Sequence, residues 1–484
     1  MNVMFIYPNQ DGIGYIPVGI SLLSSILKNN GHNTSLFDTT FYSSNGDDDN
    51  DNLQFKRTDS KLPTKRCVDI YKLLKDKIEK FKPDLIAGTC TSNDYEFLCD
   101  ILKFIKNNYD IPVIVGGPHT TVVPDEVISE TFIDIICIGE GESALLELCN
   151  RMELNRNIYN ISNLWIKFKN KIYKNDIGPL VKDMDTLPYP DWDIFNDENH
   201  YRPFDGKIYY FGWFEFGRGC PFSCTYCINP HLHKIYKGKG NYYRSKSPKR
   251  MMDELLHFKK KYNIKFVRFV DETFLAMPIS KIKEFAELYN KHIRLPFIIS
   301  SRPETINDES VNILKSMITC KHISMGIESG NETLRRNVLN RQLSNDTIYK
   351  AFKLLQKNGI KTTAFNIIGF PTETRDMIFD TIKINKQIQP DVIVVSLFYP
   401  YKGTPLRDVC INEGYIDSDK VVNYTSDTIL NMPQISRESL IGLKRAFILY
   451  ARLPRLLYPL IVLSERISCM YFIMSNIYKY KYGI

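Results

Sequence analysis

The stretch GRGCPFSCTYCINP, residues 217–230, places three of the chain's eleven cysteines within eight positions. They are Cys220, Cys224 and Cys227, with the spacing C-x3-C-x2-C. The stretch directly follows an apolar run, Tyr209–Glu215, that reads as a buried strand. In barrels of parallel strands, chemistry takes place at the carboxyl ends of the strands, so this position favours a functional loop.

Three thiolates at this spacing can bind a single metal centre, and the spacing alone leaves two interpretations open. One is a structural zinc site, which His231 or His233 could complete as a fourth ligand. The other is a [4Fe–4S] cluster held by only three cysteines. Such clusters usually take four thiolates, so three would leave one iron open.

The residues around the cysteines alternate between apolar runs and segments of helical periodicity from about 206 to 415. The predicted strands are Tyr209–Glu215, Phe266–Val270, Phe297–Ser301, His322–Ile327, Thr362–Ile368 and Val392–Leu397. The predicted helices are Pro248–Tyr262, Ile279–His292, Ser310–Met317, Asn331–Val338, Thr347–Asn358 and Arg375–Gln387. Six strand–helix units are too few for an eightfold barrel and predict a partial (β/α)6 barrel with one open side.

The cysteine motif, with an aromatic residue just before the last cysteine, resembles that of the radical S-adenosylmethionine (radical SAM) superfamily. The resemblance implies that the open iron binds the amino and carboxylate groups of SAM. An electron from the cluster then cleaves SAM to a 5′-deoxyadenosyl radical, which abstracts hydrogen from the substrate. The cofactors supply the chemistry, and the protein supplies placement and excludes water.

Motifs after three later strands extend this resemblance. FVDETF resembles the motif that contacts the methionyl amino group, and GIESG puts a carboxylate where it could accept hydrogen bonds from ribose. FNIIGFPTET resembles the adenine-side motif loosely, because Phe365 stands where the family has its leading glycine. The SAM-binding residues that the resemblance implies are Tyr226, Asp271, Glu272, Glu328, Arg341 and Gly369. A surface position is the alternative reading of Arg341.

Residues 1–154 show a second alternation, which predicts a doubly wound parallel sheet. Its predicted strands are Val3–Tyr7, Thr34–Asp38, Asp84–Thr89, Pro112–Gly116 and Asp134–Ile138. Its predicted helices are Val18–Asn30, Cys67–Phe81, Asp94–Asn107 and Ser143–Met152. The acidic stretch 43–57 predicts a surface loop, and residues 155–205, with a hairpin and the run LPYPDWDIF, predict a linker.

The first half resembles the cobalamin-binding domain that precedes the barrel in one large radical SAM subfamily. That subfamily includes methyltransferases and the anaerobic magnesium-protoporphyrin ester cyclase. GGPH, GEGE and the P-x-G start of the first helix recur in it in this order. The resemblance implies a flavodoxin-like strand order and cobalamin at the strand ends. The implied contacts are Thr89, Thr91, Gly116, Gly117, His119, Gly139 and Glu140.

One feature departs from many cobalamin proteins, because the DxHxxG segment whose histidine coordinates cobalt is absent. NQDGIG, residues 9–14, occupies the comparable loop and offers no imidazole. Bound cobalamin is therefore expected to lack a protein imidazole on its lower face. A domain that binds no cofactor is the alternative.

Composition restricts the class of partner. Sixty-three Lys and Arg against fifty-five Asp and Glu give a net charge of +8, which is mild for 484 residues, so nucleic acid is not expected. The start of the chain lacks the pattern of a secretory signal, and the scattered cysteines suit buried positions in a cytoplasmic protein. Residues 416–484 are expected to be mostly helical. Their apolar run Leu456–Phe472 is too interrupted to span a bilayer, leaving weak membrane-surface contact at most.

The sequence thus predicts a radical SAM enzyme that acts on a small molecule with an external electron donor of the ferredoxin or flavodoxin type. Within the subfamily, cobalamin-dependent methyl transfer to an unactivated centre is favoured. Radical-mediated oxidative cyclisation or rearrangement is one alternative. Methylthiotransferase-like RNA modification, which needs a second cysteine-held cluster, and a zinc-stabilised binding module are the others. No residue identifies the substrate or a catalytic side chain acting on it.

Overall fold

The computed structural model describes residues 1–9, 16–43, 65–169, 171–317, 319–416 and 427–482. Its described residues form two compact units. The first holds 1–9, 16–43, 65–169, 171–213 and 231–246, and the second holds 214–230, 247–317, 319–416 and 427–482. The loop predicted at 43–57 lies, beyond Ser43, outside the described residues. The strands form two seven-stranded sheets, the first of which lies within the first unit.

The sheet of the first unit has the order β2-β1-β5-β6-β7-β8-β9. The strands are β1 (Asn2–Tyr7), β2 (Asn33–Asp38), β5 (Leu85–Thr89), β6 (Val113–Gly116), β7 (Ile135–Cys137), β8 (Leu164–Phe168) and β9 (Lys171–Lys174). Neighbours from β2 to β7 are parallel, whereas β8 and β9 are antiparallel to their neighbours. The five parallel strands confirm the flavodoxin-like order. The hairpin predicted within the linker continues this sheet.

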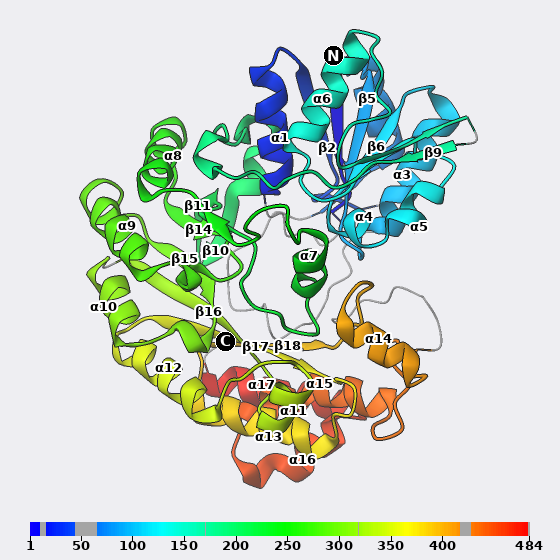
Figure 1. Cartoon of the computed structure of the whole chain (residues 1–484). Coiled ribbons are helices and arrows are strands. Elements are labelled where there is room, and N and C mark those ends of the chain that lie inside the picture. The colour runs from blue at the N-terminus through cyan, green and yellow to red at the C-terminus, as the bar shows by residue number, and fades with distance from the viewer. Residues whose placement is uncertain (10–15, 44–64, 170, 318, 417–426, 483–484) are drawn as a thin grey trace. The chain divides into compact units, whose positions relative to one another are not determined.

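Helices α1 (Val18–Asn29), α2 (Ile70–Phe81), α3 (Tyr95–Asn108) and α6 (Glu142–Glu153) cover the first sheet (Figure 1). Helix α2 shows why they form. The Asp69 carboxylate accepts hydrogen bonds from two backbone N–H groups at its start, and Ile70, Leu74 and Ile78 recur every fourth residue and are buried. With helices on both faces, the parallel strands are buried, which explains their continuous apolar runs.

The second sheet has the order β10-β11-β14-β15-β16-β17-β18. The strands are β10 (Tyr201–Phe204), β11 (Lys207–Phe214), β14 (Phe266–Phe269), β15 (Phe297–Ser301), β16 (Cys320–Glu328), β17 (Lys361–Ile368) and β18 (Val392–Leu397). From β14 to β18 all neighbours are parallel. Strand β10 was not predicted, although Asp205-Gly206, both with positive φ, is a strong hairpin turn signal.

Five helices follow one another along the outer side of this sheet (Figure 1). They are α8 (Pro248–Lys261), α9 (Ile279–His292), α10 (Asp308–Ser316), α12 (Asn345–Lys357) and α13 (Arg375–Ile388). The arrangement confirms the partial barrel. Helix α14 (Pro405–Asn412) follows the last strand, and α15 (Arg437–Arg452), α16 (Tyr458–Ser464) and α17 (Ser468–Tyr482) confirm a mostly helical end. Within the described part of the chain, none of the helices is long and apolar enough to cross a membrane.

Candidate active site

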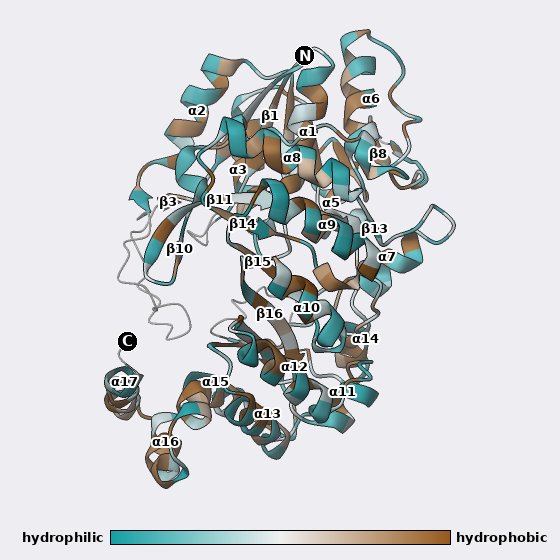
Figure 2. Ribbon diagram, turned by 90° about the vertical axis from the view of Figure 1, so that its left-hand side faces the viewer, coloured by the Kyte–Doolittle hydropathy of each residue, from teal (hydrophilic) through white to brown (hydrophobic). Residues whose placement is uncertain are grey.

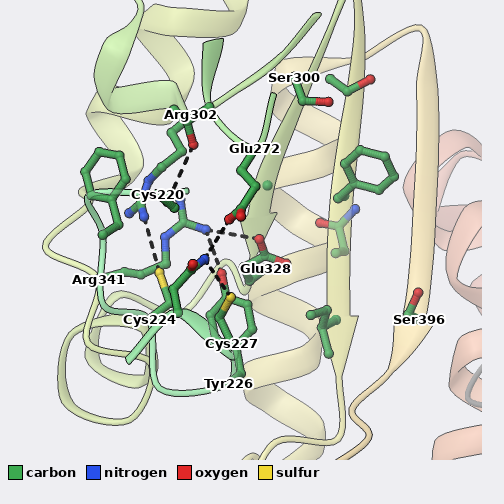
Figure 3. A pocket seen from close by; sticks show the side chains of 18 of the residues that line it. Cys220, Cys224, Tyr226, Cys227, Glu272, Ser300, Arg302, Glu328, Arg341 and Ser396 are labelled. Atoms are coloured by element: carbon green, nitrogen blue, oxygen red, sulfur yellow. Dashed lines mark hydrogen bonds and ion pairs between the residues drawn. The ribbon is translucent and has the colours of Figure 1, made fainter. Parts of the chain in front are cut away.

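A cavity of about 490 Å³ lies within the second unit, at the carboxyl ends of the barrel strands (Figure 3). All three cysteines of the motif line it, together with charged side chains that follow three of the strands. Those charged residues are Glu272 after β14, Arg302 after β15, Glu328 at the end of β16 and, further along the chain, Arg341. The structure thus brings together residues that are up to about 120 positions apart in the sequence.

The cysteine loop is fixed in place by Asp271. Its carboxylate accepts hydrogen bonds from the backbone N–H groups of Phe216 at 3.1 Å and Gly217 at 2.5 Å, which immediately precede the loop. Burial raises the pKa of Asp271 to about 7, even though these two donors favour the charged form. Asp271 does not line the cavity, so its role in this structure is to position the loop.

Each cysteine sulfur has a polar neighbour that could donate a hydrogen bond to a thiolate. Arg302 Nη1 lies 3.2 Å from Cys224 Sγ, and Asn229 Nδ2 lies 3.3 Å from Cys227 Sγ. The third sulfur, of Cys220, is 3.9 Å from the hydroxyl of Thr273. In the metal-free chain burial raises the pKa of Cys227 to about 11, so a bound metal centre would have to supply the charge that favours its thiolate.

The donor set fits a cluster better than a zinc ion. A zinc site needs its ligands about 2.0–2.3 Å from one point. In the part of the chain that the structure describes, no group of three His, Cys, Asp or Glu side chains is arranged to hold a single ion. His231 and His233 are also not among the residues that line the cavity. A [4Fe–4S] cluster distributes its thiolates over a larger body, and the three cysteines share one cavity wall with room in front of them.

A buried ion pair lies beside the cysteine loop (Figure 3). Arg341 Nη1 donates to Glu328 Oε1 at 3.1 Å and lies 3.4 Å from the Tyr226 hydroxyl. Arg341 is only 2% exposed, which corrects the alternative reading of a surface arginine. Its Nε has no hydrogen-bond partner among the described residues, and Nη2 lies 3.5 Å from the Glu304 carboxylate. A buried guanidinium with an unsatisfied N–H suits an anionic ligand such as the SAM carboxylate.

The backbone at Glu328 is specialised. Glu328 has a φ of +64°, in the left-handed region that side chains rarely adopt, and the strand register shifts between Gly326 and Glu328. A Cβ at position 326 would collide with Glu328 Oε1, so a larger residue there would displace this carboxylate. Burial raises the pKa of Glu328 while Arg341 opposes that shift. The bulge therefore turns a buried carboxylate into the cavity.

The two remaining predicted SAM residues, Glu272 and Gly369, differ in whether they line the cavity. Glu272 lines the cavity, and its carboxylate accepts a hydrogen bond from Asn229 Nδ2 at 2.6 Å. Gly369 has a φ of +87° but does not line the cavity. Its N–H donates to Glu373 at 2.6 Å, and a Cβ at this position would contact the side chain of Leu440. On this stretch, Phe365 lines the cavity instead.

Arg302 and Asn229 were missed by the sequence reasoning, although both contact cysteine sulfurs. Arg302 also stacks 3.7 Å over the ring of Phe222 and pairs with Glu304 at 2.5 Å. Arg302 belongs to no motif that the sequence reasoning used, and Asn229 stands in the cysteine stretch 217–230 but was not singled out. The available signal for Arg302 was its place directly after β15, where the other strands of the barrel also carry functional side chains.

In the first unit, most of the predicted cobalamin contacts lie at the ends of adjacent parallel strands. Thr89, Gly116 and Gly139 end or follow β5, β6 and β7. Gly117 has a φ of +98°, and a Cβ there would come within 2.6 Å of the Thr89 hydroxyl. The edge accordingly presents backbone and small side chains, which suits close approach by a large ligand.

Other predicted cobalamin contacts are already engaged within this unit. Glu140 forms an ion pair with Arg244 and accepts a hydrogen bond from the Val181 N–H at 2.9 Å. The Thr91 hydroxyl donates to Asp94 at 2.6 Å. His119 is buried, with Nδ1 3.0 Å from the Ser92 hydroxyl and its ring 4.2 Å from that of Tyr95.

Two family models match the chain on either side of residue 200. The model of the B12 binding domain matches residues 14–149, and that of the Radical SAM superfamily matches residues 214–384. The second match includes the cysteine motif and the residues that line the cavity up to Asn366 and Ile367.

Curated relatives match most of the chain. An uncharacterized methyltransferase of Pyrococcus horikoshii is 28% identical over 393 residues, 80% of this chain and 82% of the relative. The anaerobic magnesium-protoporphyrin IX monomethyl ester cyclase of Rubrivivax gelatinosus is 26% identical over 422 residues, 84% of this chain and 69% of the relative. Among solved structures, the radical SAM methyltransferase TsrM of Kitasatospora setae has the same fold, with a TM-score of 0.67, 16% identity and coverage of 90% and 79% of the two chains.

Proposed function

The chain is a radical SAM enzyme that carries a B12-binding domain, and from this premise we propose that it transfers a methyl group to an unactivated centre of a small molecule. The observation that carries the proposal is the combination of a B12-binding domain with a cavity in which three cysteines lie beside a buried ion pair. When bound, the [4Fe–4S] cluster and SAM supply a carbon radical, and cobalamin supplies a methyl carrier.

The residues of the cavity have separable tasks in this proposal. Cys220, Cys224 and Cys227 hold the cluster, and Arg341 binds the carboxylate of SAM. Glu328 accepts hydrogen bonds from the ribose and holds Arg341 in place. These groups keep SAM in one orientation, so that the reactive carbon forms at a fixed point in the cavity.

The substrate would occupy the part of the cavity that is lined neither by the cysteines nor by the ion pair. Its wall there is largely aromatic and is contributed by β17 and the residues that follow β18: Phe365, Phe398, Tyr399 and Tyr401. Aromatic walls exclude water, which protects a radical from unwanted reactions. An external electron donor of the ferredoxin or flavodoxin type would supply the electrons.

Two alternatives receive less support. A methylthiotransferase would need a second cysteine-held cluster, but the cysteines of the first unit lack the tight spacing of a cluster motif: Cys90, Cys99, Cys137 and Cys149 are buried and dispersed along the chain, and Cys67 is exposed. Oxidative cyclisation without methyl transfer is the second alternative, and the similarity to the magnesium-protoporphyrin cyclase is the observation on its side. Analysis of the reaction products separates it from methylation.

The products of SAM test the proposal before any substrate is known. The protein is reconstituted anaerobically with iron and sulfide, supplied with cobalamin and reduced in the presence of SAM. Methyl transfer predicts S-adenosylhomocysteine, from methylation of cobalt, in addition to 5′-deoxyadenosine. A Cys224→Ala variant should lose 5′-deoxyadenosine, whereas Cys410→Ala, a buried cysteine outside the cavity, should retain it.

The alternative outcomes are distinct. Formation of 5′-deoxyadenosine alone, with cobalamin bound, would contradict methyl transfer and favour cyclisation or rearrangement. If a protein with a full iron and sulfide content does not cleave SAM, the cavity is not the site that binds the cluster and SAM together.

A further inference from the structure

The two last helices carry a concentration of exposed apolar side chains that the active site does not use. Of the 21 exposed large hydrophobic residues among the described positions, ten lie between residues 456 and 482. They are Leu456, Leu460, Val462, Leu463, Ile467, Phe472, Ile473, Ile477, Tyr480 and Tyr482, which we call the C-terminal apolar surface. Figure 2 shows the hydrophobic colouring of α16 and α17. An apolar surface this concentrated marks an interaction site.

Helix α17 is apolar on two sides. Its inner side packs against the hydrophobic core through Met470, Met474 and Tyr478. Ile473, Ile477 and Tyr480, spaced four and three residues apart, form a separate stripe that is exposed, with Ile473 51% and Tyr480 93% accessible. A helix that is apolar all round is normally buried all round, so the outer stripe of α17 lacks the apolar contact that its composition calls for.

The charges around this surface are almost all positive. Arg455, Arg466 and Lys481 are exposed beside it. The single acidic residue between positions 453 and 482 is Glu465, and its carboxylate is 7% exposed and paired with Arg375 at 2.6 Å. The surface therefore combines exposed apolar side chains with exposed basic side chains, and its tyrosines have both an apolar ring and a polar hydroxyl.

We propose that the C-terminal apolar surface binds to the interface of an anionic phospholipid membrane. Helices α16 and α17 would lie in the plane of the interface, with Phe472, Ile473 and Ile477 below the headgroups and the basic side chains among the lipid phosphates. The helices are too short to span a bilayer, in agreement with the absence of a spanning helix among the described residues. The proposal does not depend on the reaction that the enzyme performs.

Co-sedimentation of the full chain with vesicles tests the proposal. We expect binding to phosphatidylcholine vesicles that contain about 30% phosphatidylglycerol, little binding to phosphatidylcholine alone, and weaker binding at high salt. Ile473→Glu combined with Tyr480→Glu should reduce binding at least about tenfold, because it places charge in the apolar layer. Arg466→Gln with Lys481→Gln should reduce binding to the anionic vesicles about tenfold, because both exposed charges lie beside the apolar surface.

Ile411→Glu is the matched control, since Ile411 on α14 is 54% exposed in the same unit but lies outside this surface. It should bind vesicles like the unaltered protein, and all variants should keep their thermal unfolding midpoint and their capacity to load iron. Absence of binding to either vesicle, or equal loss in the Ile411→Glu control, would overturn the proposal. So would a dimer in gel filtration that the Ile473→Glu change dissolves, because the surface would then bind a second copy of the chain.

Discussion

Arg302 Nη1 lies 3.2 Å from the sulfur of Cys224, on the wall of the cavity where the cluster would be held. A cation that donates a hydrogen bond to a thiolate stabilises the more negative, reduced form of an iron–sulfur cluster. The guanidinium is kept in this position by the ring of Phe222 and by the Glu304 carboxylate. Arg302 thus acts on the reduction potential of the cluster and not on the binding of the substrate.

Replacement of Arg302 by glutamine should lower the reduction potential of the cluster. A lost hydrogen bond to a charged group costs about 1.5–3 kcal/mol, which corresponds to about 60–130 mV for one electron. The measurement is a potentiometric titration followed by paramagnetic resonance of the reduced cluster. Arg302→Lys should restore part of the shift because it keeps the charge. An unchanged potential in Arg302→Gln with full iron content would contradict this role.

Glu328→Gln should weaken SAM binding while the cluster stays intact. The loss of a charged hydrogen bond predicts an affinity about 10- to 150-fold lower. Equilibrium dialysis with the reconstituted protein measures this, and iron and sulfide analysis verifies the cluster. Glu254→Gln is a matched control, since Glu254 is a buried carboxylate that pairs with Arg250 at 3.0 Å outside the cavity. If both variants bind SAM like the unaltered protein, Glu328 has a structural role only.

Glu373 predicts a pH dependence of stability. Burial raises the pKa of its carboxyl to about 8, although the N–H groups of Gly369 and Phe370 oppose the shift. The unfolded chain releases this proton near its ordinary pKa of 4.5, so the folded state binds more protons between the two values. The free energy of unfolding should therefore fall as pH rises from about 5 to about 8, by at most about 1.4 kcal/mol per pH unit from this group.

Glu373→Gln removes that proton and should flatten the slope within this window. Urea unfolding of both proteins at several pH values measures the difference. A slope as steep in the variant as in the unaltered protein would assign the pH dependence to other groups.

The sequence predicted the elements of both sheets closely, because buried parallel strands are continuous apolar runs and their helices repeat every three to four residues. The cysteine motif located the site for a local reason, since its three ligands lie within eight positions. The contacts between distant residues could not be predicted in this way. Arg302 approaches Cys224 only because β15 ends beside the cysteine loop, a relationship that tertiary packing creates.

The neighbouring acids Asp271 and Glu272 show the same limit within one motif. Both follow β14, but Glu272 lines the cavity while Asp271 holds the backbone of Phe216 and Gly217. Sequence spacing gives no indication of this division, because it depends on how the chain bends after the strand. The strand β10 is a different case, since its Asp-Gly turn was visible in the sequence but lay in a segment interpreted as a linker.

Cobalamin bound to the first unit should lack a histidine ligand from the protein. Residues 8–17 contain no histidine, and His119, in the short helix α4 (Pro118–Val122) after β6, is held by Ser92 and packed on Tyr95. The small residues of segments 88–93 and 116–121 would let the nucleotide tail of cobalamin approach the strand ends, away from the cobalt. A cobalt without a strong lower ligand should release a methyl group more readily in the form that radical transfer requires.

The paramagnetic resonance spectrum of the Co(II) form is expected to show no nitrogen superhyperfine splitting, and His119→Ala should leave it unchanged. Splitting that changes when the protein is labelled with ¹⁵N-histidine would contradict this, because it would identify a protein imidazole on the cobalt. Failure of the protein to retain cobalamin at all would instead show that the domain has lost its ligand along with the histidine.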